Sequence, residues 1–218
     1  MLQYIQQSPI GISPRLMKLQ LRLRSGLTAV LVSAYAPTMT ATEDEKEAFY
    51  ESLNAVIESV PYKHKLFILG DFNARVGRDY STWPRVLGHH SVGNENSNGS
   101  LLLQTCNQNE LAITNTYFQQ ANKYKTTWQH PRSKHWHMLD YVITRHRNLE
   151  EVHITRVMRG TCCWSDHRLV RSVVALSLCR PRCHRAVRCR RLDVAKLQLD
   201  EYKQELQKTL LTACFLAA

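Results

Sequence analysis

The stretch that decides the fold prediction is residues 66–73, with the sequence LFILGDFN. An unbroken run of large apolar residues that ends at a glycine is typical of a buried β-strand. Gly70 permits close approach of another backbone, and Asp71 and Asn73 follow it two positions apart. Side chains at that spacing point to the same side of an extended chain. The sequence therefore predicts a strand over residues 65–69 that delivers two polar side chains at its C-terminal end.

Two later segments carry matching chemistry. Asp140 interrupts an apolar strand, and Asp166 and His167 precede another. Burying an unpaired carboxylate costs on the order of several kcal/mol. We therefore expect Asp140 to have a hydrogen-bond partner, and His167 is the natural candidate. In phosphodiester hydrolysis a carboxylate can take a proton from water, while amide and imidazole donors stabilise charge on the phosphoryl oxygens.

Each of these residues also has a purely local interpretation. Asp71 and Asn73 can form an Asx turn that satisfies nearby backbone groups. Asp140 can face solvent on an edge strand, and Asp166 with His167 can be a turn beside a surface histidine. Their occurrence together at three strand ends favours a shared site.

Periodicity predicts the remaining elements. Residues 15–24 alternate, with Met17, Leu19, Leu21 and Leu23 on one side, as in a half-buried strand. Thr42 and Glu45 form a capping box that opens a helix over 43–60. This helix has an apolar stripe of Phe49, Leu53, Val56, Ile57 and Val60. Further strands are expected near 27–35, 111–114, 126–128, 137–144, 151–158 and 168–177, with a short helix over 99–107 and a polar loop over 74–97.

This mixture of strands and helices indicates an α/β (α+β) fold of two packed sheets flanked by helices. The chain has 218 residues, enough for one domain, which we place at residues 1–178. Residues 179–192 hold six arginines and no acidic residue, as expected of a basic linker. The pattern of residues 193–218 predicts an amphipathic helix. The cysteines in this linker match no standard zinc spacing.

The formal charge of +11 favours a polyanionic partner, with nucleic acid first. The seven cysteines form no regular framework, and no secretory signal or membrane-spanning apolar run is visible. We therefore expect an intracellular protein without a membrane partner, in the nucleus rather than the cytoplasm, and a monomer.

The order of four segments resembles the endonuclease/exonuclease/phosphatase superfamily, and more closely the endonuclease domains of non-LTR retrotransposons and the relatives of craniofacial development protein 2. The similarity covers roughly residues 10–178. The segments that carry it are 33–38, 69–77, 128–141 and 166–170.

This resemblance implies a four-layer α/β/β/α sandwich and a role for each residue of the site. Asp71 would activate or orient water, and Asn73 would donate to the scissile phosphate. His167 would contact that phosphate, oriented by Asp140, and Tyr35 would reach it as well. Asp166 would help to hold a divalent cation, Mg²⁺ or Mn²⁺.

Aromatic and basic side chains ahead of Asp140 are candidates for nucleic-acid binding. Aromatic faces stack on bases or sugars, and lysine and arginine contact phosphates. Core packing and a solvated loop are the respective alternatives. The candidates are Trp128, Trp136, His137, Lys123, Lys125, Arg132 and Lys134.

The chain departs from the resembled pattern at its front. Members begin with a strand that carries an Asn, followed by a segment with a metal-binding Glu, whereas the first acidic residue here is Glu43. We therefore expect a fold that lacks this first strand and a weakened cation site, since Mg²⁺ needs hard oxygen ligands.

Three functions follow in order of preference. The first is metal-dependent hydrolysis of phosphodiester bonds in DNA, by an endonuclease of retrotransposon type, with RNA as a possible substrate. The second is a catalytically impaired module that binds nucleic acid or protein. The third is a phosphatase for phosphoinositide-type substrates, which the net charge disfavours.

Overall fold

The computed structural model of this chain describes residues 5–24, 26–160 and 165–178. The chain divides into two units, residues 1–181 and 182–218, and every described residue lies in the first. The predicted basic linker 179–192 and amphipathic helix 193–218 fall outside the described residues. None of the helices in the described ranges is long and apolar enough to cross a membrane.

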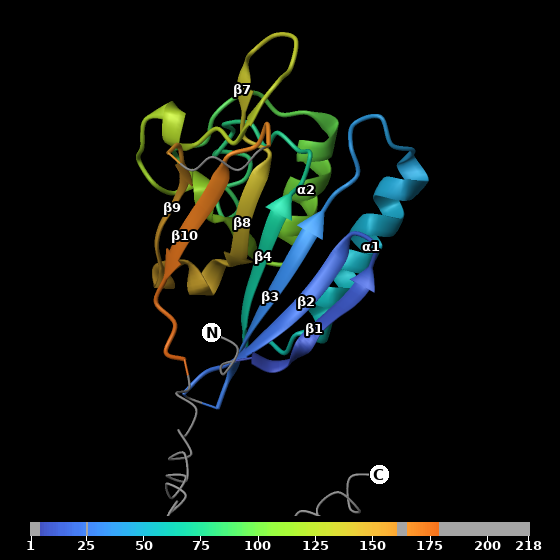
Figure 1. The fold of residues 1–218 in the computed structure, drawn as a ribbon, viewed down its shortest axis with the longest axis vertical. Coiled ribbons are helices and arrows are strands. Elements are labelled where there is room, and N and C mark those ends of the chain that lie inside the picture. The colour runs from blue at the N-terminus through green and yellow to red at the C-terminus, as the bar shows by residue number, and fades with distance from the viewer. Residues whose placement is uncertain (1–4, 25, 161–164, 179–218) are drawn as a thin grey trace, which may run out of the picture. The chain divides into compact units, whose positions relative to one another are not determined.

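A six-stranded mixed sheet forms the centre of the described unit (Figure 1). Neighbouring strands are antiparallel except β3 and β4, which are parallel. Parallel neighbours need a crossover connection, and helix α1 supplies it here. The strands, in spatial order, are β1 (Ile5–Ser13), β2 (Leu16–Arg22), β3 (Thr28–Tyr35), β4 (Lys65–Asp71), β8 (Asp140–Arg145) and β5 (Leu111–Ile113).

Helix α1 (Glu43–Ser59) covers one face of this sheet. Both bonds of the predicted capping box are present: the Thr42 hydroxyl accepts from the amide of Glu45, and the Glu45 carboxylate accepts from the amide of Thr42. All five residues of the predicted apolar stripe are buried, and they pack with alternate residues of β3 and β4. The amphipathic pattern thus predicted both the helix and its buried side.

Helix α2 (Ser97–Gln108) packs into the same core. It begins two residues before the predicted start, because Asn96 acts as its N-cap and accepts from the amide of Gly99 at 2.8 Å. The same Asn96 oxygen accepts from the amide of Arg75 at 2.8 Å. The long loop predicted over 74–97 is therefore tied back on itself at both ends.

A second sheet, β9 (Val152–Met158) with β10 (Leu169–Val174), faces the opposite side of the six-stranded sheet (Figure 1). Together with the two helices this makes an α/β sandwich, as expected for the superfamily. Between the sheets lies a groove of about 540 Å³, lined on the first sheet by Leu31 and Leu69 among others. Among the described residues, no strand pairs with the second edge of β10.

The predicted side of β2 is buried only in part: Leu23 is 5% exposed and Leu19 and Leu21 are half-buried. Leu16 is 2% exposed and packs on the helix side, whereas Met17 is 45% exposed. Met17, Leu19 and Leu21 lie opposite Ser33, Leu31 and Ala29 of β3 in the antiparallel ladder. Alternation gave the strand correctly, but it could not tell which face the rest of the chain would cover.

Strand β1 was not predicted from the sequence. Its register with β2 shifts three times along its length, and it contains Pro9 and Gly11. Proline cannot donate to a sheet ladder and glycine weakens a strand, so both are confined largely to edge strands and bulges. β1 is such an edge strand, which is why the local pattern concealed it.

The later strands are shorter than predicted or divided. The strand expected over 137–144 splits into β7 (Trp136–His137) and β8, and the one expected near 126–128 is β6 (Trp128–Gln129), which pairs with β7 as a hairpin. Short 3₁₀ helices connect the remaining elements: η2 (Thr114–Thr116), η3 (Asn122–Tyr124) and η4 (His146–Glu151).

We expect Thr42→Ala to lower the free energy of unfolding by about 1 kcal/mol, because it removes the cap of α1. Ser52→Ala is the matched control: it also deletes a hydroxyl, but within the same helix, where alanine is a better helix former. Urea unfolding would compare both variants with the wild type. Equal stabilities for the two variants would show that the capping box contributes nothing.

Gly70→Ala should destabilise the fold by more than about 2 kcal/mol. A Cβ at Gly70 would lie 1.8 Å from the carbonyl oxygen of Ala34, and the Gly70 φ of +153° is rarely adopted by other residues. Gly11→Ala is the control, since a Cβ there meets nothing within 4 Å. Thermal unfolding of both variants tests the close approach of β3 and β4. A Gly70→Ala variant as stable as Gly11→Ala would contradict it.

Candidate active site

Asp71 and Asp140 face each other at one end of the six-stranded sheet. Asp71 ends β4, Asp140 begins β8, and the two are direct partners in the antiparallel ladder. On the other side of β4, Asp71 is in register with Tyr35, the last residue of β3. The strand register thus places three of the predicted residues in one row.

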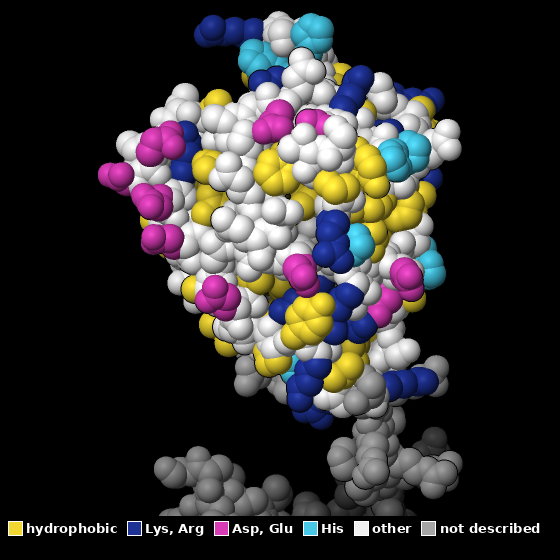
Figure 2. All heavy atoms as spheres, turned by 180° about the vertical axis from the view of Figure 1, so that it is seen from behind, with side chains coloured by type: hydrophobic (Ala, Val, Ile, Leu, Met, Phe, Trp, Pro, Cys, Tyr) yellow, Lys and Arg dark blue, Asp and Glu magenta, His cyan; other side chains and the backbone are white. Residues whose placement is uncertain are grey.

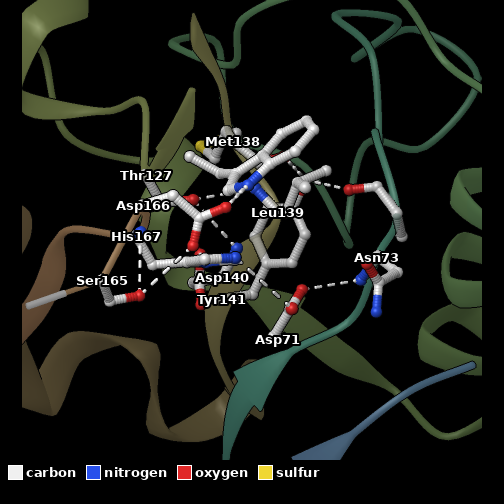
Figure 3. Close-up of polar contacts among 12 residues, drawn as sticks. Asp71, Asn73, Thr127, Met138, Leu139, Asp140, Tyr141, Ser165, Asp166 and His167 are labelled. Atoms are coloured by element: carbon white, nitrogen blue, oxygen red, sulfur yellow. Dashed lines mark hydrogen bonds and ion pairs between the residues drawn. The ribbon is translucent and has the colours of Figure 1, made fainter. Parts of the chain in front are cut away.

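His167 lies between the two carboxylates (Figure 3). Its Nδ1 is 2.9 Å from Oδ2 of Asp140, and its Nε2 is 3.9 Å from Oδ2 of Asp71. The hydrogen bond expected between Asp140 and His167 is therefore present, although these residues are 27 positions apart. Since a carboxylate only accepts, Nδ1 carries the donated proton. The hydrogen bond that His167 donates to Asp140 raises the pKa of His167 above its usual value, and burial opposes this shift.

The Asp71 carboxylate is half-buried, and this burial raises its pKa above the usual value. The amide of Asn73, which donates to Oδ1 of Asp71 at 2.9 Å, works against the shift, and the charge of Asp140 adds to it. This amide bond is the one expected of an Asx turn. The local interpretation of Asp71 and Asn73 is thus correct as far as it goes, and it coexists with their place in the cluster.

Asn73 adopts a left-handed backbone conformation, with φ of 47°. Asparagine tolerates this conformation better than most residues. Its side-chain amide donates to the carbonyl oxygen of Ala36 at 2.9 Å, and its own carbonyl accepts from the side chain of Asn98 at 3.1 Å. These bonds fix Asn73 beside Asp71, and its second side-chain N–H has no hydrogen-bond partner among the described residues.

Two polar residues that the sequence did not single out hold Asp140 in place. The buried hydroxyl of Thr127 accepts from the amides of Leu139 and Asp140 at 3.0 and 3.2 Å. The side chain of Asn115 donates to the carbonyl of Asp140 and accepts from the amide of Val142. No local pattern marks Thr127 or Asn115, because their partners lie 12 to 27 positions away.

Asp166, the predicted cation ligand, lies outside the carboxylate cluster. Its Oδ2 accepts from the indole N–H of Trp128 at 2.6 Å, and this bond lowers the pKa of Asp166. Trp128 is half-buried, and its ring centroid is 6.2 Å from that of His167. In this structure the pair supports the segment that carries His167.

The described residues contain one group with the geometry to hold a metal ion: Asp71, Asp140 and His167, whose ligand atoms lie within 4.8 Å of one another. Two carboxylates suit a hard divalent cation, which usually takes one or two carboxylates and completes its shell with water and phosphate oxygens. The donor set of Asp71, Asp140 and His167 therefore fits such a cation.

Tyr35 is 52% exposed. The guanidinium of Arg15 lies 5.5 Å from the centre of its ring. Core packing, the alternative explanation for this tyrosine, does not account for a ring so open to solvent. The structure leaves the Tyr35 hydroxyl accessible at the same end of the sheet as Asp71.

The basic candidates divide into exposed and buried residues. Lys123 is exposed, and Arg132 and Lys134 are exposed in the turn between β6 and β7. Figure 2 shows basic side chains and histidines at the top of the molecule. Lys125 is only 8% exposed, and its ammonium donates to the carbonyl of His90 at 2.7 Å. Burial, with Arg78 nearby, lowers the pKa of Lys125. Lys125 is thus a structural residue in this structure and not an open phosphate contact.

Trp136 and His137 form β7 and are half-buried. The guanidinium carbon of Arg168 lies 3.2 Å above the centre of the Trp136 ring, which leaves one face of the indole occupied by a cation. Neither residue belongs to the main hydrophobic core. The packing alternative therefore applies only locally, within the hairpin and its neighbours.

Comparison with known proteins agrees with this geometry. The family model described as Endonuclease-reverse transcriptase matches residues 29–171, more than half of the chain. Craniofacial development protein 2 from Bos taurus is 37% identical over 148 residues, and that from Tragulus javanicus is 36% identical. Each match covers 68% of this chain and 25% of the relative, so the chain spans about a quarter of the length of these relatives.

Solved structures share the fold at low identity. The endonuclease domain of TRAS1, a telomere-specific non-LTR retrotransposon, superposes with a TM-score of 0.55 and 19% identity, covering 74% of this chain and 64% of that one. The catalytic domain of Xenopus laevis APE2 gives 0.57 and 20%, over 75% and 56%. A 3′ phosphatase from Neisseria bound to a product DNA hairpin gives 0.54 and 18%, over 78% and 71%.

The matched segment, residues 29–171, contains all three residues of the carboxylate–histidine cluster: Asp71, Asp140 and His167. The fold, the order of the sequence motifs and the similar proteins all indicate the same family. The chain belongs to the Endonuclease-reverse transcriptase family of the endonuclease/exonuclease/phosphatase superfamily.

Proposed function

We propose that this chain hydrolyses phosphodiester bonds in DNA with the help of a divalent cation. One observation carries the proposal: His167 is held by Asp140 through Nδ1 and turns its Nε2 toward Asp71 at the end of the sheet. A third group that orients an imidazole in this way is a recurrent feature of hydrolytic sites. Two proteins of similar fold, the endonuclease domain of a non-LTR retrotransposon and a 3′ phosphatase bound to a product DNA hairpin, support DNA as the substrate.

His167 would stabilise the charge that develops on the phosphoryl oxygens. Since Nδ1–H donates its hydrogen bond to Asp140, the Nε2–H of a protonated ring is the donor that remains for substrate. The raised pKa of His167 keeps this ring protonated over a wider pH range than a free histidine. A donor that is already oriented by Asp140 needs no rearrangement when the transition state forms.

Asp71 would orient the attacking water through its carboxylate, which the amide of Asn73 holds in place. Asn73 would donate its second side-chain N–H to a phosphate oxygen, while its first stays with Ala36. Tyr35, next to Asp71 in the sheet, is the further donor at this edge.

A divalent cation would be held by the carboxylates of Asp71 and Asp140. When bound, it supplies positive charge that polarises the phosphoryl oxygen and stabilises the leaving oxygen. Mg²⁺ and Mn²⁺ both accept such oxygen ligands. A DNA substrate makes the nucleus the compartment of this activity, as part of the same proposal.

A second function, binding of nucleic acid without cleavage, is favoured by one observation. Burial raises the pKa of Asp71, and Asp140 carries a like charge directly opposite it, so the two carboxylates are held together at an energetic cost that His167 offsets only in part. A chain that holds this cation weakly would still bind DNA through its basic residues. The activity test below separates the two functions.

His167→Ala should reduce nicking of supercoiled plasmid DNA in Mg²⁺ by at least about 100-fold, the scale at which a positioned acid or base contributes. His153→Ala is the control, since His153 is exposed near the far end of β9. EDTA should stop cleavage by the wild type. Cleavage that persists in His167→Ala, or in EDTA, would show that the chemistry lies elsewhere. DNA binding by a wild type that never cleaves would favour the binding function instead.

The imidazole of His167 should titrate above pH 6.5 in the metal-free protein, and Asp140→Asn should lower that pKa. NMR titration of the histidine Cε1–H signals measures both, with His153 as an internal reference. Because the folded-state pKa is raised, its stabilising contribution is present below about pH 6.5 and is lost as the pH rises through the raised value. The unfolding free energy of the wild type should therefore fall over that window more than that of Asp140→Asn. An unchanged His167 pKa in the variant would remove Asp140 as its cause.

A further inference from the structure

A cavity of about 490 Å³ adjoins the site and is lined by positively charged side chains. Its volume falls in the range of about 300–1,000 Å³ usual for ligand pockets. No aspartate or glutamate lines it. The five cationic residues in its wall are Arg75, Arg78, Lys123, Arg159 and Arg168.

None of these five cations forms an ion pair with a carboxylate of the described residues. Like charges gathered in a concave site repel one another more strongly than on an open surface, because water screens them less. The crowding shows in the pKa of Arg168, which burial lowers and the charge of Arg159 lowers further. Such an arrangement gains its missing counter-charge when an anion binds.

The two inner arginines are held in place through their backbones. The amide of Arg75 donates to Asn96, and the carbonyl of Arg75 accepts from the amide of Asn96. The amide of Arg168 donates to the carbonyl of Thr127 at 2.7 Å, and its guanidinium lies on the ring of Trp136. The pocket is therefore largely formed before any ligand arrives, which lowers the entropic cost of binding.

The pocket shares residues with the flank of the carboxylate–histidine cluster. Arg168 directly follows His167, and Arg75 comes two residues after Asn73. His137 also lines the pocket, and it pairs with Trp128, which bridges to His167. A phosphate in the pocket and a phosphate at the cluster would thus be close neighbours on one strand.

We infer that this basic pocket binds the phosphate next to the scissile one in the same nucleic-acid strand, with Trp136 beside its sugar or base. The inference rests on the proposed phosphodiesterase function and deepens it, because the chain would contact two successive phosphates of one strand. Arginine suits this task because its planar guanidinium can bind a phosphate through two hydrogen bonds. Five cations around one cavity provide more charge than a single phosphate ester requires.

The test is binding of a fluorescein-labelled 12-nucleotide single-stranded DNA, followed by fluorescence anisotropy in EDTA so that turnover plays no part. We expect the double variant Arg78→Ala/Arg159→Ala to bind at least 10-fold more weakly. The slope of log Kd against log salt should fall by about 1.4, since each single-strand phosphate contact contributes about 0.7. Both residues are exposed, so their replacement should leave the fold intact, which circular dichroism checks.

Two controls make the result specific. Arg22→Ala removes an exposed arginine at the opposite end of the six-stranded sheet, where β2 meets the start of β3, and should change the affinity less than twofold. Arg78→Lys/Arg159→Lys keeps the charges and should retain most of the salt slope.

An affinity unchanged in the alanine variant, or reduced only as much as in Arg22→Ala, would overturn the inference. The inference would also fail if inositol hexakisphosphate bound to the protein without displacing the oligonucleotide, and if the affinity for the oligonucleotide did not depend on Arg78 and Arg159. Absence of plasmid nicking would refute the proposed hydrolysis alone, because the binding experiment needs no cleavage. The two proposals can therefore fail separately.

Discussion

Two carboxylates, Asp71 and Asp140, stand opposite each other across the β4–β8 ladder, and the site depends on keeping them there. Like charges in this position destabilise a sheet, and partial burial of Asp71 adds to the cost. The imidazole of His167 lies between them and offsets part of it. The strain of this pair is thus balanced by the same group that would act on a phosphate, so removing His167 would alter both the stability and the chemistry of this edge.

The register of β4 is what brings these groups together, and the packing of the core fixes that register. A shift by one residue would move every side chain of the strand to the opposite face. It would also place a side chain where the Gly70 backbone approaches Ala34, at a position with room only for hydrogen. Tyr141, which follows Asp140, is fully buried with its hydroxyl within hydrogen-bond distance of the carbonyls of Ala74 and Met138. Position-specific contacts therefore hold the ladder from both strands.

The sequence sufficed for elements whose cause is local. Each of these predictions depends on residues that are close together in the chain: the apolar run before Gly70, the Thr42 capping box and the apolar stripe of α1. The structure has each of these elements. Strand β1 was not predicted because an edge strand tolerates proline and an irregular register. Residues whose partners are distant in the sequence were missed for another reason. Neither the hydroxyl of Thr127 under Asp140 nor the burial of Lys125 against His90 leaves a local pattern, since both follow from how separate loops pack.

Charge is distributed unevenly around the site, and this bears on how a polyanion would approach. Acidic residues gather along α1, with Glu43, Asp44 and Glu45 in its first turn, where negative charge interacts favourably with the helix dipole. Figure 2 shows acidic side chains along the left edge of the view. The cations of the β6–β7 hairpin and of the basic pocket lie on the His167 side of the cluster. A strand of nucleic acid would be repelled along α1 and attracted along the pocket. The field thus favours one direction of approach across Asp71 and His167, before any contact with a base is made.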